Sequence, residues 1–144
     1  MFRKLLVVAG AAGLALAATP ASATTTETVV TCGYSGLQSG LQTKVCAEVT
    51  GDQVQLYGQV GLAGPPSPGT VLQPKELIVG LTGQIVGGAS LGTVQGYRTF
   101  TASTIQVRGV GGTVPCGSTV HASFSVASYP WAPNPVTLDL PIAC

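Results

Sequence analysis

The sequence predicts an all-β protein: an antiparallel two-sheet sandwich of immunoglobulin-like type, with seven or eight strands and two disulfides. Three observations predict it. Apolar and polar residues alternate through most of the chain, 20 glycines and 10 prolines interrupt the alternating segments, and the four cysteines allow two bridges. Alternation with a period of two is typical of strands that face a core on one side and water on the other. A small barrel is the alternative architecture.

The first 23 residues read as a secretory signal peptide. Arg3 and Lys4 precede an apolar run from Leu5 to Ala18, and an Ala-x-Ala cleavage site ends at Ala23. The run is shorter than the ~20 residues that span a bilayer, which disfavours the alternative of an uncleaved anchor. We therefore expect a secreted, extracellular protein whose residues 24–144 form one domain and whose mature form meets no membrane.

Four strands are expected in the first half of that domain, at 28–33, 43–49, 53–62 and 76–85. In the third, for example, Val54 and Leu56 alternate with Gln53 and Gln55. Gly51-Asp52 is typical of a tight hairpin turn between the second and third strands. A proline-rich connection, Ala63-Gly-Pro-Pro-Ser-Pro-Gly69, leads towards the fourth.

Four more strands are expected at 93–101, 104–110, 119–127 and 135–143. In 119–127, Val120 and Ala122 alternate with Thr119 and His121. If successive strands alternate in direction, the connections gather at two ends of the sandwich. One end then holds 34–42, 63–75 and 128–134, and the other holds 50–52, 86–92, 111–118 and the C-terminus.

Four cysteines remain after the signal peptide: Cys32, Cys46, Cys116 and Cys144. An even number in a secreted chain predicts two disulfides, for which three pairings are possible. Cys32 and Cys46 face each other across the first connection, and Cys116 and Cys144 fall at one end of the sandwich. We therefore expect Cys32–Cys46 and Cys116–Cys144. No metal site is expected, because the chain has no C-x-x-C motif and a single histidine.

The charge content argues against several classes of function. Only 8% of residues are charged, against a usual ~25%. Removal of Arg3 and Lys4 leaves four basic residues against five acidic ones, so no electrostatic footprint for nucleic acid is present. Because few side chains could move a proton, we expect neither an enzyme nor a cofactor.

Two catalytic motifs are weak. Gly88-Ala-Ser90-Leu-Gly92 matches the G-x-S-x-G nucleophile elbow, but the elbow needs a helix after the serine, and here a strand is expected. His121 and Asp139 could form a triad with a serine. Both fall on polar strand faces, where solvated side chains are normal. Arg98 and Arg108 are also interpreted as solvated strand residues, with binding to a carboxylate of a partner as the alternative. No catalytic residue is therefore assigned.

Two segments are candidate partner-binding sites. Tyr129-Pro130-Trp131 is an aromatic loop stiffened by proline, with residue types that are common at interface hot spots. The alternative is that Trp131 folds back and caps the sandwich. Pro65, Pro66 and Pro68 are expected at the same end as a second wall.

The second candidate is the N-terminal segment of the mature chain. It is β-prone and is either an edge strand or a free arm that adds to a partner's sheet. It comprises Thr24, Thr25, Thr26, Glu27, Thr28, Val29 and Val30.

Several stretches resemble one family. They are Cys32-Gly-Tyr34, Thr43-Lys-Val-Cys46, Gly61-Leu-Ala-Gly-Pro-Pro-Ser-Pro68, Val114-Pro-Cys-Gly-Ser-Thr-Val-His121 and Ser128-Tyr-Pro-Trp131. Together they are similar to the small adaptor subunit of the umbrella toxin particles secreted by Streptomyces. The resemblance implies a non-enzymatic β-sandwich that links a repeat-built scaffold protein to a lectin-like subunit, partly through its N-terminal segment.

The residues alone favour a protein–protein interaction module whose partners are other secreted proteins. An inhibitor of an extracellular hydrolase is one alternative, with 129–135 as the inhibitory loop. A small-molecule carrier, like the enediyne-binding sandwiches of actinomycetes, is another.

Overall fold

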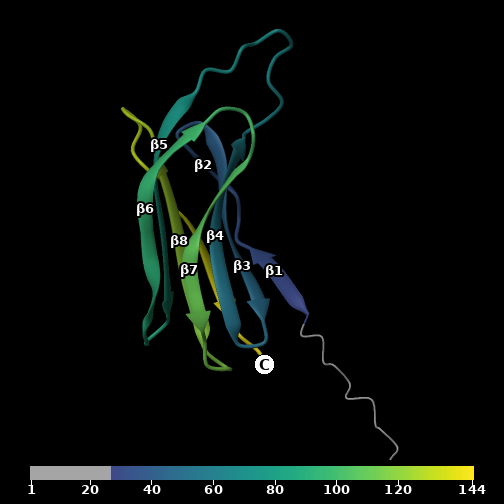
Figure 1. Ribbon diagram of the computed structural model, residues 1–144, viewed down its shortest axis with the longest axis vertical. Helices are drawn as coiled ribbons and strands as arrows, with labels where there is room; N and C mark the ends of the chain where they lie inside the picture. Colours follow the sequence, from purple (N-terminus) through teal and green to yellow (C-terminus); the bar gives the residue numbers. More distant parts are fainter. Residues whose placement is uncertain (1–26) are drawn as a thin grey trace, which may run out of the picture.

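The structure is a computed structural model that describes residues 27–144, and this part of the chain contains nine strands and no helix (Figure 1). All strand pairs are antiparallel and form two sheets, so the predicted all-β, two-sheet sandwich with two disulfides is confirmed. The immunoglobulin-like assignment stays a prediction. The expected signal peptide, residues 1–23, and Thr24, Thr25 and Thr26 lie outside the described residues.

Five strands form sheet A, in which β1 and β2 both pair with β3 and the order continues through β4 to β7. Four strands form sheet B in the order β6-β5-β8-β9. Sheet A comprises β1 (Thr28–Cys32), β2 (Gly36–Gln38), β3 (Leu41–Thr50), β4 (Gln53–Leu62) and β7 (Ile105–Thr113). Sheet B comprises β5 (Lys75–Ile85), β6 (Ser90–Phe100), β8 (Thr119–Ala127) and β9 (Val136–Pro141).

The eight predicted strands correspond to eight of these nine, and the short β2 is the strand that the sequence pattern missed. The start of β6 also differs from prediction, since it begins at Ser90 rather than at residue 93. A bulge explains the difference. Gly83 pairs with Gly92 and Gln84 pairs with Ser90, so Leu91 is the extra residue and the alternation is interrupted there.

The core lies between the inner faces of the two sheets and is built from the alternating apolar residues. Phe124 of β8 reaches across to β4, where a Cβ atom at Gly58 would come within 2.2 Å of the Phe124 ring. Glycine is therefore required at that point of closest approach. The largest fully buried hydrophobic side chains are Phe100, Phe124, Leu56, Leu77, Leu81 and Ile142.

A buried glutamine also joins the two sheets. Gln38 of β2 donates from Nε2 to Thr43 Oγ1 at 2.9 Å and to the Phe124 carbonyl at 3.0 Å. Its Oε1 accepts from the Val126 amide at 2.9 Å and from the Asn134 amide at 3.1 Å. Four bonds satisfy the buried amide, as a polar group in a core requires. They also fasten the connection between β8 and β9.

Both predicted disulfides are confirmed. Cys32 lies directly opposite Cys46 in the β1–β3 pair, with 4.0 Å between the Cα atoms. Cys116 and Cys144 bridge at the end of the sandwich where the chain terminates, with 5.3 Å between the Cα atoms. The predicted division of connections between two ends is also right. Figure 1 shows 63–74 and the turn after β8 at one end, and the β3–β4 turn and the C-terminus at the other.

No helix within residues 27–144 is long and apolar enough to cross a membrane.

Candidate functional site

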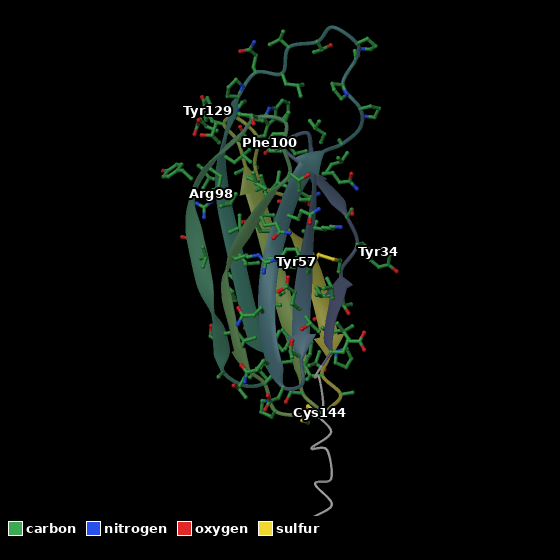
Figure 2. All side chains as sticks on the ribbon, turned by 45° about the vertical axis from the view of Figure 1, so that its right-hand side comes forward. Tyr34, Tyr57, Arg98, Phe100, Tyr129 and Cys144 are labelled. Atoms are coloured by element: carbon green, nitrogen blue, oxygen red, sulfur yellow. A yellow bond between two sulfur atoms is a disulfide. The ribbon has the colours of Figure 1, made fainter. Side chains whose placement is uncertain are left out.

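The aromatic segment forms a turn directly after β8. The Trp131 amide donates to the Ser128 carbonyl at 2.6 Å, and the Ser128 amide donates to the Trp131 carbonyl at 3.3 Å. Ser128 is buried, whereas Tyr129 is 96% exposed and Trp131 is 62% exposed. Figure 2 shows Tyr129 at this end of the molecule. Trp131 therefore does not cap the core, and the turn presents a fully exposed tyrosine and a largely exposed tryptophan.

The proline-rich connection lies at the same end, as predicted. A hollow of about 370 Å³ there is lined by Leu72, Gln73, Pro74 and Lys75 together with residues of β3, β4 and β6. Neither Tyr129 nor Trp131 lines it. The proline-rich connection and the aromatic turn therefore do not form the two walls of this hollow.

The N-terminal candidate is an edge strand from Thr28 onward. Thr28, Val29 and Val30 pair with Thr50, Val49 and Glu48 of β3, so a free arm is the wrong alternative for these three residues. Glu27 lies just before the strand. Both valines remain exposed. Within residues 27–144, no other strand pairs with the outer side of β1, and β1 lacks the proline or lysine residues that usually block further pairing at a sheet edge.

An apolar groove adjoins this edge strand. It has a volume of about 360 Å³ and lies between β1 and the C-terminal segment. Val29 and Val49 line one side, and Leu140 and Ile142 line the other. Because Thr28 pairs with Thr50 beside the β3–β4 turn, Val29 and this groove lie at the end opposite to Trp131 (Figure 1).

The two weak catalytic motifs meet on the outer face of sheet B. Ser90 and His121 both line a hollow of about 400 Å³. His121 Nδ1 lies 2.6 Å from Asp139 Oδ1 across the β8–β9 pair. Gln84 stands between Ser90 and His121 in the strand register. Ser90 Oγ instead accepts from the Gly92 amide at 3.1 Å and donates to the Gly83 carbonyl at 3.5 Å.

The register therefore separates the candidate nucleophile from the candidate base by one side chain. A nucleophilic serine needs a base within hydrogen-bond reach. The elbow also needs a helix after the serine, whereas Ser90 opens β6. Neither requirement is met at Ser90 in the described chain.

An ion pair occupies the outer face of sheet A. Arg108 donates to Glu48 at 2.8 and 3.2 Å, and its guanidinium carbon lies 4.5 Å from the centre of the Tyr57 ring. The hydrogen bonds from Arg108 hold the pKa of Glu48 below its usual range, and the same contact raises the pKa of Arg108. Tyr57 is left only 7% exposed. Arg98 faces solvent, as predicted, and its Nη1 donates to the Tyr97 carbonyl at 2.9 Å.

The sequence reasoning missed an exposed pair on sheet B. Tyr97 of β6 is 75% exposed and lies directly opposite Ile78 of β5, which is also exposed. Both fall on the outer face. Large apolar residues at polar-face positions were the signal that could have identified them.

Among residues 27–144, no group of three or more His, Cys, Asp or Glu side chains is arranged to hold a metal ion. In comparisons with known proteins, neither a protein-family model, nor a curated protein, nor a solved structure matches this chain.

Proposed function

We propose that this chain is a secreted, non-enzymatic adaptor that binds two other secreted proteins at once. One observation carries the proposal: two pairs of exposed apolar side chains, Tyr129 with Trp131 and Val29 with Val30, lie at opposite ends of a sandwich stiffened by two disulfides. The aromatic turn lies at one end, and the β1 edge with its groove lies at the other (Figure 1). Two separated surfaces on one rigid body are what a linking protein requires.

The aromatic turn supports the proposal through its residue types and its order. Tyr and Trp are the most frequent interface hot spots, because a large rigid ring buries much area at a low cost in side-chain entropy. The two backbone bonds between Ser128 and Trp131, and the bond from Asn134 to Gln38, hold the turn before any partner arrives. A pre-ordered loop loses little entropy on binding.

The β1 edge supports a different mode of docking. An extended segment of a partner can pair with the free edge of β1 through main-chain hydrogen bonds and place side chains against Val29 and Val30. The groove lined by Val29 and Leu140 would take apolar side chains of that segment. The resemblance to the umbrella toxin adaptor names a class of partner that fits, namely other subunits of an extracellular particle.

A second candidate function is inhibition of an extracellular hydrolase. The observation that favours it is the same stiff turn, since an exposed, pre-ordered loop can occupy a cleft. The two functions differ in the number of partners and in what happens to a partner's activity.

Co-purification with the tagged protein from culture supernatant tests the proposal, using variants at each end. Trp131→Ala should weaken one partner by ~2 kcal/mol or more, about 30-fold, without changing the melting temperature. Val30→Lys should abolish binding of the other partner, which docks on the β1 edge. Val71→Ala, an exposed apolar position in the proline-rich connection, serves as the control.

Capture of two proteins, each lost in one variant, would support the adaptor. A single captured hydrolase that loses activity would indicate the inhibitor. Retention of every partner by both variants would contradict both functions. A first measurement needs no partner: Trp131 is the only tryptophan, so its fluorescence should be that of a water-exposed indole readily quenched by iodide.

A further inference from the structure

The outer face of sheet B carries polar side chains aligned in rows across the strands. The strand register places hydroxyl-bearing residues of all four strands side by side, and the next row combines a hydroxyl, an amide, an imidazole and a carboxylate. The first row is Thr93, Thr82, Ser123 and Thr137, and the second is Ser90, Gln84, His121 and Asp139. Donors and acceptors therefore alternate over a surface that spans the whole sheet.

A hollow interrupts this face beside the β6 bulge. The extra residue at Leu91 displaces the start of β6, and Gly92 adopts a φ of 120° there. Bulges often occur beside binding sites because they redirect side chains. The resulting hollow of about 400 Å³ falls within the range of small-molecule pockets. All of its lining residues are polar or glycine: Thr82, Gly83, Gln84, Ser90, Thr93, His121 and Ser123.

An aromatic ring stands on the same face beyond the hollow. Tyr97 follows Thr93 by four residues along β6, a distance of about 13 Å at the usual rise of a strand. Its ring is largely exposed and lies beside Ile78. Between them, Gln95 lies opposite Gly80, so the strip from the hollow to Tyr97 is polar.

The charges on this face exclude some ligands. Lys75 and Arg98 pair with Phe100 and Leu77, so both leave their strands on the side opposite to Tyr97, although Arg98, on the edge strand β6, still reaches solvent. The acidic groups on the outer face are already engaged, since Glu76 accepts from Thr99 at 2.8 Å and Asp139 pairs with His121. A phosphate or another anion would therefore find no lysine or arginine to bind on this face, and the one imidazole there, His121, is engaged by Asp139.

The composition of the hollow also differs from that of a protein interface. The centres of protein interfaces are enriched in aromatic residues, Met and Arg, and depleted in Ser. The hollow and the two rows are instead rich in Ser and Thr and contain no Met, Arg, Tyr, Phe or Trp. We therefore propose that the outer face of sheet B binds a neutral oligosaccharide, a role that goes beyond the proposed adaptor function.

The chemistry of a sugar matches each part of this surface. Sugar hydroxyls both donate and accept, as do the side chains of Thr82, Gln84 and Ser123. Asp139 engages Nδ1 of His121, which leaves Nε2 for a ligand hydroxyl. The apolar C–H face of a sugar ring stacks on the open ring of Tyr97, and the strip between Tyr97 and the hollow accommodates the intervening units.

A printed array of neutral and acidic oligosaccharides tests the inference with the purified protein, followed by titration of the best neutral binder. We expect binding to neutral members. Tyr97→Ala should weaken the affinity at least tenfold, and Thr82→Val should weaken it several-fold by removing one hydroxyl from the first row. Val71→Ala is the control, because Val71 is an exposed apolar residue of the proline-rich connection and lies outside sheet B.

Three outcomes would overturn the inference: no binding to any neutral member, binding to acidic members alone, or an equal loss in Val71→Ala. Melting temperatures of the variants should stay close to that of the parent, because Tyr97 and Thr82 are exposed. If Tyr97→Ala failed to fold, the Thr82→Val titration and amide shifts of β5, β6 and β8 on addition of the sugar would still decide.

Discussion

The outer faces of the two sheets each carry a tyrosine, and the two tyrosines differ in how much of the side chain is exposed to solvent. Tyr57 of sheet A is 7% exposed, whereas Tyr97 of sheet B is 75% exposed. Tyr57 stands in a row between Cys46, which is bridged to Cys32, and Arg108, whose guanidinium covers the ring. Tyr97 has Ile78 beside it, and its ring is bare.

The difference shows that strand alternation decides which face a side chain is on, but not how much of it water reaches. Cross-strand neighbours decide the latter. Sheet A uses its own charges to cover its aromatic ring, and Glu48 in turn holds Arg108 in place. Sheet B leaves comparable surface uncovered, which is why we propose sugar binding on its outer face and a structural role for the Arg108 cluster on sheet A.

Paired alanine substitutions at the two tyrosines should give the largest contrast. Tyr57→Ala should lower the free energy of unfolding by about 3 kcal/mol, because a nearly buried ring and its packing are lost. Tyr97→Ala should change it by no more than ~0.5 kcal/mol. Urea unfolding with both disulfides intact measures each value. Equal losses of stability at the two positions would contradict a structural role for Tyr57 that Tyr97 lacks.

The two arginines should differ by a smaller amount. Arg108→Ala removes a cation above an aromatic ring and an ion pair, and it exposes Tyr57, so about 1–2 kcal/mol of stability should be lost. Arg98→Ala removes one exposed bond to a backbone carbonyl and should fall within ~0.5 kcal/mol of the parent. Second-derivative ultraviolet absorbance should also report a more exposed tyrosine in Arg108→Ala alone. Without that change, Arg108 would not be the cover of Tyr57.

Much of the fold could be predicted because its signals are local. Alternation identified six of the eight predicted strands, and the alternating directions of successive strands were enough to pair the four cysteines. β2 was missed because three residues cannot display a period. Gln38 falls in the predicted connection 34–42. Its hydrogen bonds to Phe124, Val126 and Asn134 join positions 86 to 96 residues apart, which no local pattern reveals.

The candidate site was less predictable, since it depends on register. Leu56 pairs with Val110 and Tyr57 with Arg108, so the extra residue in β7 is Gly109, which has a φ of 118°. That bulge aligns Arg108 with Tyr57. A second bulge, at Leu91, creates the hollow on sheet B. The sequence shows that Gly109 and Gly92 interrupt the alternation of their strands, but it does not show which side chains the bulges bring together. For the aromatic segment at 128–134, the sequence predicted the end of the sandwich at which it lies, but it left open whether Trp131 is exposed.

The pH dependence of the Arg108–Glu48 pair should give the smallest effect and the finest comparison. The pKa of Glu48 is lowered in the folded protein by its hydrogen bonds to Arg108. The pair therefore stabilises the fold fully above the unfolded pKa of about 4.3, and this contribution is lost as the pH falls through the lower folded value. Because both groups are partly exposed, the loss should be only about 0.5 kcal/mol. Urea unfolding at several pH values between 7 and 2 should show this loss in the parent, and Glu48→Gln should lack that part of the pH dependence. If Glu48→Gln lost stability with acid as steeply as the parent, the pair would not be what holds Arg108 over Tyr57, and packing of the arginine stem on the ring would have to do so.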